Sequence, residues 1–319
     1  MAFYDVFNGD ADGLCGLQQL RLAHPLETTL VTGVKRDIAL LKRVAAGEGD
    51  EVAVLDVSLD KNREPLEKLL NAGAKVQYFD HHFAGDIPRH ANLQVHIDTA
   101  PDTCTSLIVD AYLNGRHRAW AVVGAFGDNF DDSATKAARP LELSDAQLRK
   151  MRELGICLNY NGYGAAIDDL FFPPDELFRR IRPYADPLQF VAADPDVFAC
   201  LRNGSREDTA RAEAIAPELL SDRYALYIFP AEPWARRVSG VYSNQLATAA
   251  PDRAHALLTR LPEGGFVVSL RAPLNNKTGA DELCRAFPTG GGRKAAAGIN
   301  NLPDDLLSEF IDKFKAMYG

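Results

Sequence analysis

Short apolar runs alternate with amphipathic stretches along residues 1–130 of the chain. Between these runs, apolar residues recur with helical spacing, most clearly in Leu14–Leu22 and Glu64–Leu70. Five apolar runs have the length of strands, at Ala2–Phe7, Thr28–Val34, Glu51–Val57, Lys75–Phe79 and Leu93–Ile97. The third of them is almost continuously apolar, which is typical of a strand that is buried on both faces. This alternation predicts an α/β fold with a parallel sheet and right-handed crossovers.

Helical spacing then dominates residues 104–170, and prolines clustered between 173 and 195 break the pattern. The expected helices are Thr105–Tyr112, Ala119–Phe126 and Asp145–Leu158. A second alternation follows, with strands expected at Arg223–Phe229, Ala256–Arg260 and Gly265–Arg271, and helices at Ser243–Ala249, Ala280–Phe287 and Asp304–Met317. The sequence therefore predicts a parallel-sheet domain at 1–185, a linker at 186–222 and a smaller α/β domain at 223–319.

Length and composition agree with two globular domains. The chain has 319 residues, of which 46% are hydrophobic and 25% charged. No apolar run approaches the roughly 18 residues of a membrane span, and the N-terminus lacks the pattern of a secretory signal. The five cysteines are scattered, with no pair at CxxC spacing, which favours a reducing cytoplasm and argues against a zinc ribbon.

The charge balance is acidic, with 44 Asp and Glu against 35 Lys and Arg and a net charge of -9. Proteins that follow long nucleic acids usually present a basic face, so we expect no long duplex DNA as a partner and no membrane. Neither charge nor composition indicates an oligomeric state.

Carboxylates and imidazoles stand where apolar elements end, at Asp10 and Asp12, at Asp56, at Asp80-His81-His82 and at Asp128. Each segment alone is more often a turn or a helix cap, but four in order are hard to attribute to chance. Ligands of open parallel sheets bind beyond the carboxyl ends of the strands. Three strands would therefore bring together Asp10, Asp56 and Asp80-His81-His82 in one crevice. Clustered carboxylates repel one another unless a cation is present, and this mixture of oxygen and imidazole ligands suits Mn²⁺ or Mg²⁺.

A glycine-rich segment follows the strand that ends at Arg271. It reads Gly290-Gly291-Gly292-Arg293-Lys294 and is expected as a loop. Glycines let backbone N–H groups approach an anion, and an arginine can bind a phosphate through two donors. The segment therefore predicts a phosphate site in an otherwise acidic protein.

These motifs resemble a known family. DxDG, a strand-end Asp, DHH and GDN, in this order, resemble the DHH phosphoesterase superfamily. Ser-Leu-Arg followed by a triple glycine and an alanine run resembles its DHHA1 partner domain. The resemblance implies a DHH catalytic domain, a DHHA1 substrate-binding domain and two Mn²⁺ ions, with Mg²⁺ as the alternative, in a cleft between them.

The same resemblance implies a role for each motif residue. Asp56 would bridge both ions, and Asp10 would hold the second of them. Asp12, His81 and Asp128 would complete the first. His82 would contact the scissile phosphate, with Asp80 behind it. Arg271, Gly290, Gly291, Gly292 and Arg293 would bind a terminal phosphate.

Two positions depart from the family pattern. Many members carry a histidine ligand shortly before the first Asp, where this chain has Asn8. Members also often read GGGH, where this chain has Arg293. The first departure implies a weaker metal site, and the second a different phosphate clamp or a shifted specificity.

The function expected from these observations is hydrolysis of short 5′-phosphorylated oligonucleotides, above all linear dinucleotides such as pGpG, to mononucleotides. The alternatives are a RecJ-like single-strand exonuclease and a phosphatase for 3′-phosphoadenosine 5′-phosphate. A family II pyrophosphatase is disfavoured by the glycine-rich segment. The non-enzymatic alternative is a nucleotide-binding module.

Overall fold

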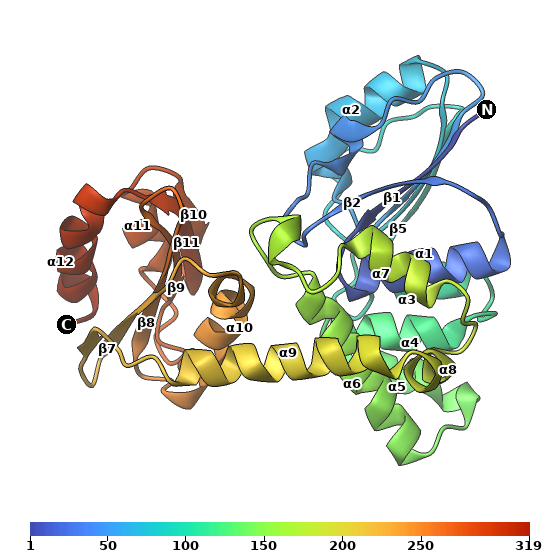
Figure 1. Ribbon diagram of the computed structural model, residues 1–319. Coiled ribbons are helices and arrows are strands. Elements are labelled where there is room, and N and C mark those ends of the chain that lie inside the picture. The colour runs from blue at the N-terminus through green and yellow to red at the C-terminus, as the bar shows by residue number, and fades with distance from the viewer. The chain divides into compact units, whose positions relative to one another are not determined.

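The computed structural model describes all 319 residues, which divide into two compact units at Met1–Asn203 and Gly204–Gly319 (Figure 1). The segment expected as a linker, 186–222, holds α8 (Pro187–Ala193), α9 (Pro195–Glu213) and β6 (Leu219–Leu220). None of the helices combines the length and the apolar character needed to cross a bilayer.

Unit 1 is built on a five-stranded sheet with the order β2-β1-β3-β4-β5. Every neighbouring pair is parallel, which confirms the predicted parallel sheet. The strands are β1 (Phe3–Asn8), β2 (Thr29–Gly33), β3 (Glu51–Leu55), β4 (Lys75–Asp80) and β5 (Leu93–Ile97). The strand order changes direction beside β1, and a crevice forms at such a point beyond the carboxyl ends of the strands.

Side chains of these strands alternate between two hydrophobic cores. Phe7 of β1 packs with α1, α3, α4 and α6, whereas Val6 packs in a separate core with α2. Tyr78 and Phe79 of β4 divide in the same way. Both faces of the sheet are therefore covered, as the nearly continuous apolar run of β3 predicted.

The helices of unit 1 include elements that the sequence pattern did not reveal. The expected helices are α1 (Ala11–Ala23), α2 (Leu59–Asn71), α3 (Thr105–Tyr112), α4 (Arg118–Gly127) and α6 (Asp145–Asn161). The additional ones are α5 (Asp131–Ala138), α7 (Pro174–Ile181) and α8, with single 3₁₀ turns at Leu40–Arg43, Arg139–Leu141 and Ile167–Asp169. Helices α7 and α8 start at prolines, because the fixed φ of proline suits the first helical position.

Unit 2 holds a six-stranded mixed sheet with the order β10-β11-β9-β8-β7-β6. Only the β7–β8 pair is parallel. Its strands after β6 are β7 (Tyr224–Phe229), β8 (Ala254–Arg260), β9 (Phe266–Arg271), β10 (Gly290–Arg293) and β11 (Ala296–Leu302). Its helices are α10 (Pro233–Ala249), α11 (Ala280–Arg285) and α12 (Leu307–Tyr318), with a 3₁₀ turn at Asp304–Leu306. Together with unit 1, this confirms the predicted α/β class.

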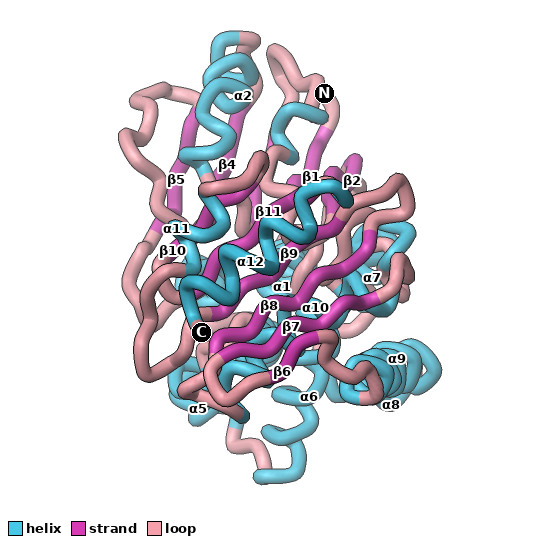
Figure 2. Tube along the Cα trace, turned by 90° about the vertical axis from the view of Figure 1, so that its left-hand side faces the viewer, coloured by secondary structure: helices cyan, strands magenta, loops and turns pink.

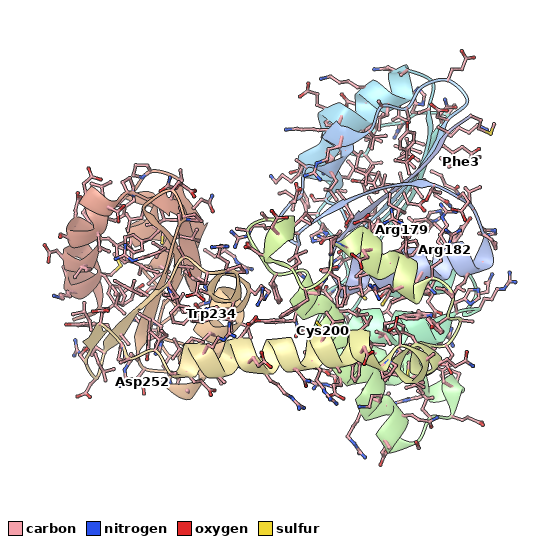
Figure 3. All side chains as sticks on the ribbon, in the orientation of Figure 1. Phe3, Arg179, Arg182, Cys200, Trp234 and Asp252 are labelled. Carbon is pink, nitrogen blue, oxygen red and sulfur yellow. The ribbon has the colours of Figure 1, made fainter.

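Helices cover both faces of this second sheet. Figure 2 shows α11 and α12 over one face, where Phe310 and Phe314 of α12 pack against Leu226 of β7. Helix α10 covers the other face, where Trp234, labelled in Figure 3, has its ring centroid 5.6 Å from that of Phe229. The side chains of β7 thus alternate between two hydrophobic cores, one on each face of the sheet.

The glycine-rich segment differs from the prediction. Gly290–Arg293 is not a loop but β10, the edge strand that pairs antiparallel with β11. A Cβ on Gly290 would lie 1.7 Å from the carbonyl oxygen of Cys284, and Gly292 has φ 139°. Both positions therefore need glycine for packing and backbone geometry. Glycine disfavours strands by itself, and cross-strand pairing overrides that preference here.

Candidate metal centre

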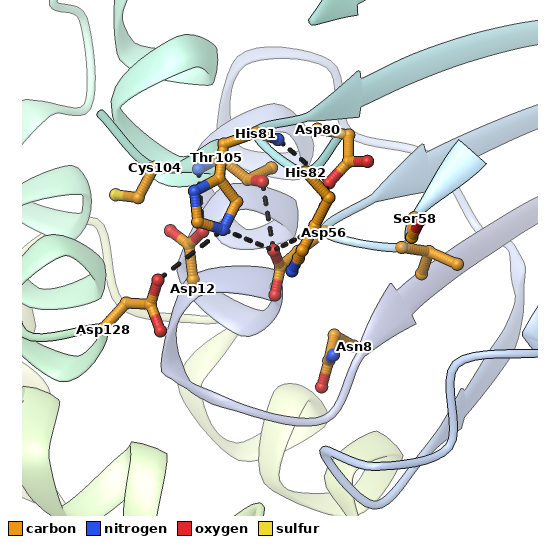
Figure 4. Close-up of polar contacts among 12 residues, drawn as sticks. Asn8, Asp12, Asp56, Ser58, Asp80, His81, His82, Cys104, Thr105 and Asp128 are labelled. Carbon is orange, nitrogen blue, oxygen red and sulfur yellow. Dashed lines mark hydrogen bonds and ion pairs between the residues drawn. The ribbon is translucent and has the colours of Figure 1, made fainter. Parts of the chain in front are cut away.

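The acids and histidines predicted from the sequence meet at the carboxyl edge of the unit 1 sheet (Figure 4). Asp10 is the N-cap of α1, where its Oδ1 accepts hydrogen bonds from the backbone N–H groups of Asp12 and Gly13. Asp56 follows β3, and Asp80 ends β4. Asp128 is the C-cap of α4. Three strands thus deliver side chains to one edge, as the strand-end rule predicts, and the end of a helix adds Asp128.

Asp12 is fully buried and joins α1 to α3. Its two carboxylate oxygens accept hydrogen bonds from the backbone N–H groups of Thr105 and Ser106, at 2.7 and 2.8 Å. These N–H groups belong to the first turn of α3, where the helix dipole favours a negative charge. The Thr105 hydroxyl also donates to Asp56 Oδ1 at 3.2 Å. Thr105 therefore supports two of the candidate ligands, although the sequence did not single it out.

His81 is oriented for metal binding through Nε2. Its Nδ1 lies 3.2 Å from the Thr103 carbonyl oxygen, so an Nδ1–H can donate there. That tautomer leaves the lone pair on Nε2. Figure 4 shows this nitrogen between two carboxylates, 3.5 Å from Asp56 Oδ1 and 3.7 Å from Asp128 Oδ2.

His82 is held by the acid that precedes the two histidines. Its Nδ1 lies 2.7 Å from Asp80 Oδ1, and that hydrogen bond, opposed by partial burial, raises the pKa of His82. The His82 side chain is 46% exposed, whereas Asp80 is fully buried. His82 is thus an oriented and accessible imidazole that favours the protonated form, which suits a contact to an anion.

Asp56 stands in a strained and electrostatically costly position. Its φ of 57° lies in the left-handed region that side chains other than glycine rarely adopt. Burial first, and then the charges of Asp10, Asp12, Asp128 and Asp80, raise the pKa of Asp56 well above its ordinary value. Such strain and repulsion concentrate at functional sites.

Two groups of these side chains can hold a metal ion. Asp12, His81 and Asp128 form one, and Asp56, His81 and His82 form the other, with the ligand atoms of each group within 4.8 Å of one another. Buried carboxylates that repel one another and an imidazole with a fixed tautomer match the donor set of Mn²⁺ or Mg²⁺. His81 belongs to both groups, whereas the resemblance assigned the shared position to Asp56.

Lys35 is a member of the site that sequence reasoning missed. It follows β2, and its Nζ lies 2.5 Å from Asp10 Oδ2 and 3.1 Å from Asp128 Oδ1. Burial acts to raise the pKa of Asp10, but the Lys35 charge and the backbone donors lower it below its ordinary value. Burial and the charge of Asp12 raise the pKa of Asp128 to about 6, against the effect of Lys35.

The predicted phosphate-binding residues lie in unit 2. Ala296 is the cross-strand partner of both Arg271 and Arg293, so the two arginines flank it on neighbouring strands. Burial, and then the charge of Arg293, lower the pKa of Arg271. Arg271 donates to Asn244, Ser269 and the Leu270 carbonyl but to no carboxylate. Two neighbouring guanidinium groups beside an edge strand with outward backbone groups form an arrangement that an anion can bind.

Comparison with known proteins gives the fold. No protein-family profile matches the chain, and no curated protein matches its sequence. Among solved structures, exonuclease RecJ bound to manganese is similar at a TM-score of 0.66 and 16% identity, over 99% of this chain and 89% of RecJ. The DHH domain of a protein assigned to a family of ribosomal proteins gives a TM-score of 0.68 at 12% identity. That match covers 99% of this chain and 86% of the other chain.

A third similar structure is the pGpG-specific phosphodiesterase PggH from Vibrio cholerae. It gives a TM-score of 0.57 at 12% identity, and the match covers 99% of this chain and 98% of PggH. All three matches extend over both units of the chain. The chain therefore shares the fold of these proteins, which is the fold that its resemblance to the DHH superfamily implies.

Proposed function

We propose that this protein is a metal-dependent phosphodiesterase that hydrolyses short 5′-phosphorylated oligonucleotides, above all linear dinucleotides, to mononucleotides. The observation that carries the proposal is the group Asp12, His81 and Asp128 beside an accessible His82 at the carboxyl edge of a parallel sheet. The fold shared with RecJ and PggH agrees with a phosphoesterase.

A divalent ion in this centre would lower the pKa of a bound water and polarise a phosphoryl oxygen. Asp12, His81 and Asp128 would hold that ion, with Asp56 as a further ligand. The pair of Mn²⁺ ions that the resemblance implies would also need Asp10, whose oxygens already accept hydrogen bonds from Lys35 and two backbone N–H groups.

His82 is the residue that we assign to the phosphate itself. Its bond to buried Asp80 fixes the ring and favours the imidazolium, which can donate to a phosphoryl oxygen through Nε2. Asp80 acts through His82 and is a positioning residue.

Arg271 and Arg293 are assigned to the terminal 5′-phosphate. A terminal phosphate bound by two guanidinium groups would contribute binding energy that a substrate without that phosphate lacks. The net charge of -9 disfavours long strands. Length alone does not separate the dinucleotide from the exonuclease alternative, because this chain covers 89% of a RecJ chain.

The terminal phosphate is the most direct test of the substrate class. We expect kcat/KM for a dinucleotide to fall about 10- to 100-fold when its 5′-phosphate is removed, because charge-assisted hydrogen bonds are worth about 1.5–3 kcal/mol. In Arg293→Ala this difference in kcat/KM should shrink, because the variant lacks one of the two guanidinium groups assigned to the 5′-phosphate. Arg260→Ala removes the same charge from the opposite end of the sheet and should keep the full difference.

The same assay decides between the alternatives. A long single strand that is degraded as efficiently as the phosphorylated dinucleotide would replace the proposal with the RecJ-like exonuclease. Phosphate release from 3′-phosphoadenosine 5′-phosphate at a higher kcat/KM would favour the phosphatase. Binding of these substrates without turnover of any of them would exclude the enzymatic alternatives and favour a nucleotide-binding module.

A further inference from the structure

The Lys35 ammonium has all of its donors engaged at the centre of the site. Its Nζ contacts Asp10 Oδ2 at 2.5 Å, Asp128 Oδ1 at 3.1 Å and Asn159 Oδ1 at 3.1 Å. A lysine ammonium carries three N–H donors, so these three acceptors match it completely. The acceptors come from the N-cap of α1, the C-cap of α4 and the last turn of α6, which together form a pocket for one cation.

The backbone and the neighbours of Lys35 hold it in this pocket. Its N–H donates to the Gly162 carbonyl at 2.8 Å, and its carbonyl accepts from Asn8 Nδ2 at 3.3 Å. Asn159 is itself oriented, because its Nδ2 donates to the Tyr163 hydroxyl at 3.1 Å. Hydrogen bonds therefore hold Lys35 at its backbone and at its ammonium group, whereas a surface lysine samples many rotamers.

Three of the four lone-pair positions of the Asp10 carboxylate are filled while Lys35 is in place, against two in Asp12. Asp10 Oδ1 accepts from the N–H groups of Asp12 and Gly13, each at 3.1 Å, and Asp10 Oδ2 accepts from Lys35. The two groups of candidate metal ligands do not include Asp10, and both need Nε2 of His81, so only one of them can be occupied at a time.

Asp128 can serve the lysine and a metal ion at the same time. Its Oδ1 accepts from Lys35, while its Oδ2 lies 3.7 Å from Nε2 of His81. One carboxylate thus joins the ammonium pocket to the group formed by Asp12, His81 and Asp128.

We propose that Lys35 supplies a built-in positive charge where a second metal ion would otherwise bind, so that the centre takes one divalent ion, at Asp12, His81 and Asp128. The presence of that one ion rests on the proposed function. An ammonium can neutralise Asp10 and attract a phosphate, but it has no open coordination position for a water. All metal chemistry would then take place at a single ion.

Ion counting tests this proposal without any substrate. Wild-type protein and Lys35→Met are saturated with Mn²⁺ and freed of excess ion, and the metal content per chain is measured. We expect one Mn²⁺ in the wild type and two in Lys35→Met, a twofold increase. Electron paramagnetic resonance should report an isolated ion in the wild type and a coupled pair in the variant. Lys42→Met, which removes an exposed lysine, should keep one ion.

A second variant assigns the gained ion to its ligand. Asp10→Asn in the wild type should leave the single ion in place, because Asp10 bonds to Lys35 rather than to metal. The double variant Lys35→Met/Asp10→Asn should return from two ions to one. Circular dichroism shows which variants fold, and Lys35→Gln, which keeps a hydrogen-bonding side chain without the charge, replaces Lys35→Met if that variant unfolds.

Each other outcome overturns the proposal in a distinct way. Two ions in the wild type, with Lys35 intact, would disprove it and leave the proposed function standing. One ion in a folded, charge-free variant would show that Lys35 does not exclude the second. No ion in the wild type would refute the metal dependence of the proposed function itself.

Discussion

Asp56→Asn is expected to lower the turnover of a phosphorylated dinucleotide by at least about 100-fold. Residues that only support metal ligands cost up to about 100-fold when they are replaced, and a ligand itself should cost at least as much. The amide removes a negative charge that faces the Asp12 and His81 ligand positions. The fold should survive, because asparagine tolerates a positive φ and can still accept the Thr105 hydrogen bond. Steady-state turnover and metal content are the measurements.

The same substitution should leave the free energy of unfolding unchanged or raise it. A buried carboxylate whose pKa is raised by its burial and by four neighbouring acids opposes folding, and the neutral amide removes that repulsion. Asp132→Asn, at an exposed position on α5, is the matched control and should alter neither turnover nor stability. Wild-type turnover and metal content in Asp56→Asn would show that Asp56 is not part of the centre.

Arg21→Met is expected to destabilise the protein by about 3–5 kcal/mol, because it leaves a buried carboxylate without its ion pair. Arg21 of α1 bonds to both oxygens of Asp5 in β1, at 2.8 and 2.6 Å, and the Asp5 side chain is fully buried. Thr28 donates to the same carboxylate at 2.7 Å. This bond ties the helix that carries Asp12, and that Asp10 caps, to β1. Equilibrium unfolding in urea measures the loss.

Two comparisons isolate the buried charge in that experiment. Arg179→Met breaks an exposed pair with Asp175 on α7 and should cost less than about 1 kcal/mol (Figure 3). The double variant Asp5→Leu/Arg21→Met removes both charges and should recover much of the loss. If Arg21→Met were no more costly than Arg179→Met, the buried pair would not hold α1 to the sheet.

Periodicity predicted the unit 1 sheet because its strands are buried on both faces. Strands such as β3 read as short apolar runs, and a parallel sheet brings their carboxyl ends together. Asp10, Asp56 and Asp80 could therefore be expected at one site from the sequence alone, whereas Asp128 follows a helix. Helices α7 and α8 could not, because a proline in a sequence indicates a break in a helix as readily as a helix start.

Lys35 illustrates why the rest of the site was missed. It follows β2, as Asp10 follows β1 and Asp56 follows β3, so the strand-end rule covers it equally. Carboxylates and imidazoles indicate a metal by their chemistry, whereas a lysine after a strand carries no such signal. Thr105 and Asn159 approach the site from helices, and their contacts depend on packing that no local pattern encodes. The strand β10 depends on pairing with β11 in the same way.

Metal dependence of turnover tests the central claim most directly. The protein is freed of metal by exhaustive chelation, its metal content is confirmed to be near zero, and hydrolysis of a 5′-phosphorylated dinucleotide is measured before and after ions are added back. We predict that chelation reduces turnover to background and that Mn²⁺ restores it better than Ca²⁺, because the ligand set at Asp12, His81 and Asp128 combines carboxylates with an imidazole. Full turnover at a metal content near zero would contradict the claim.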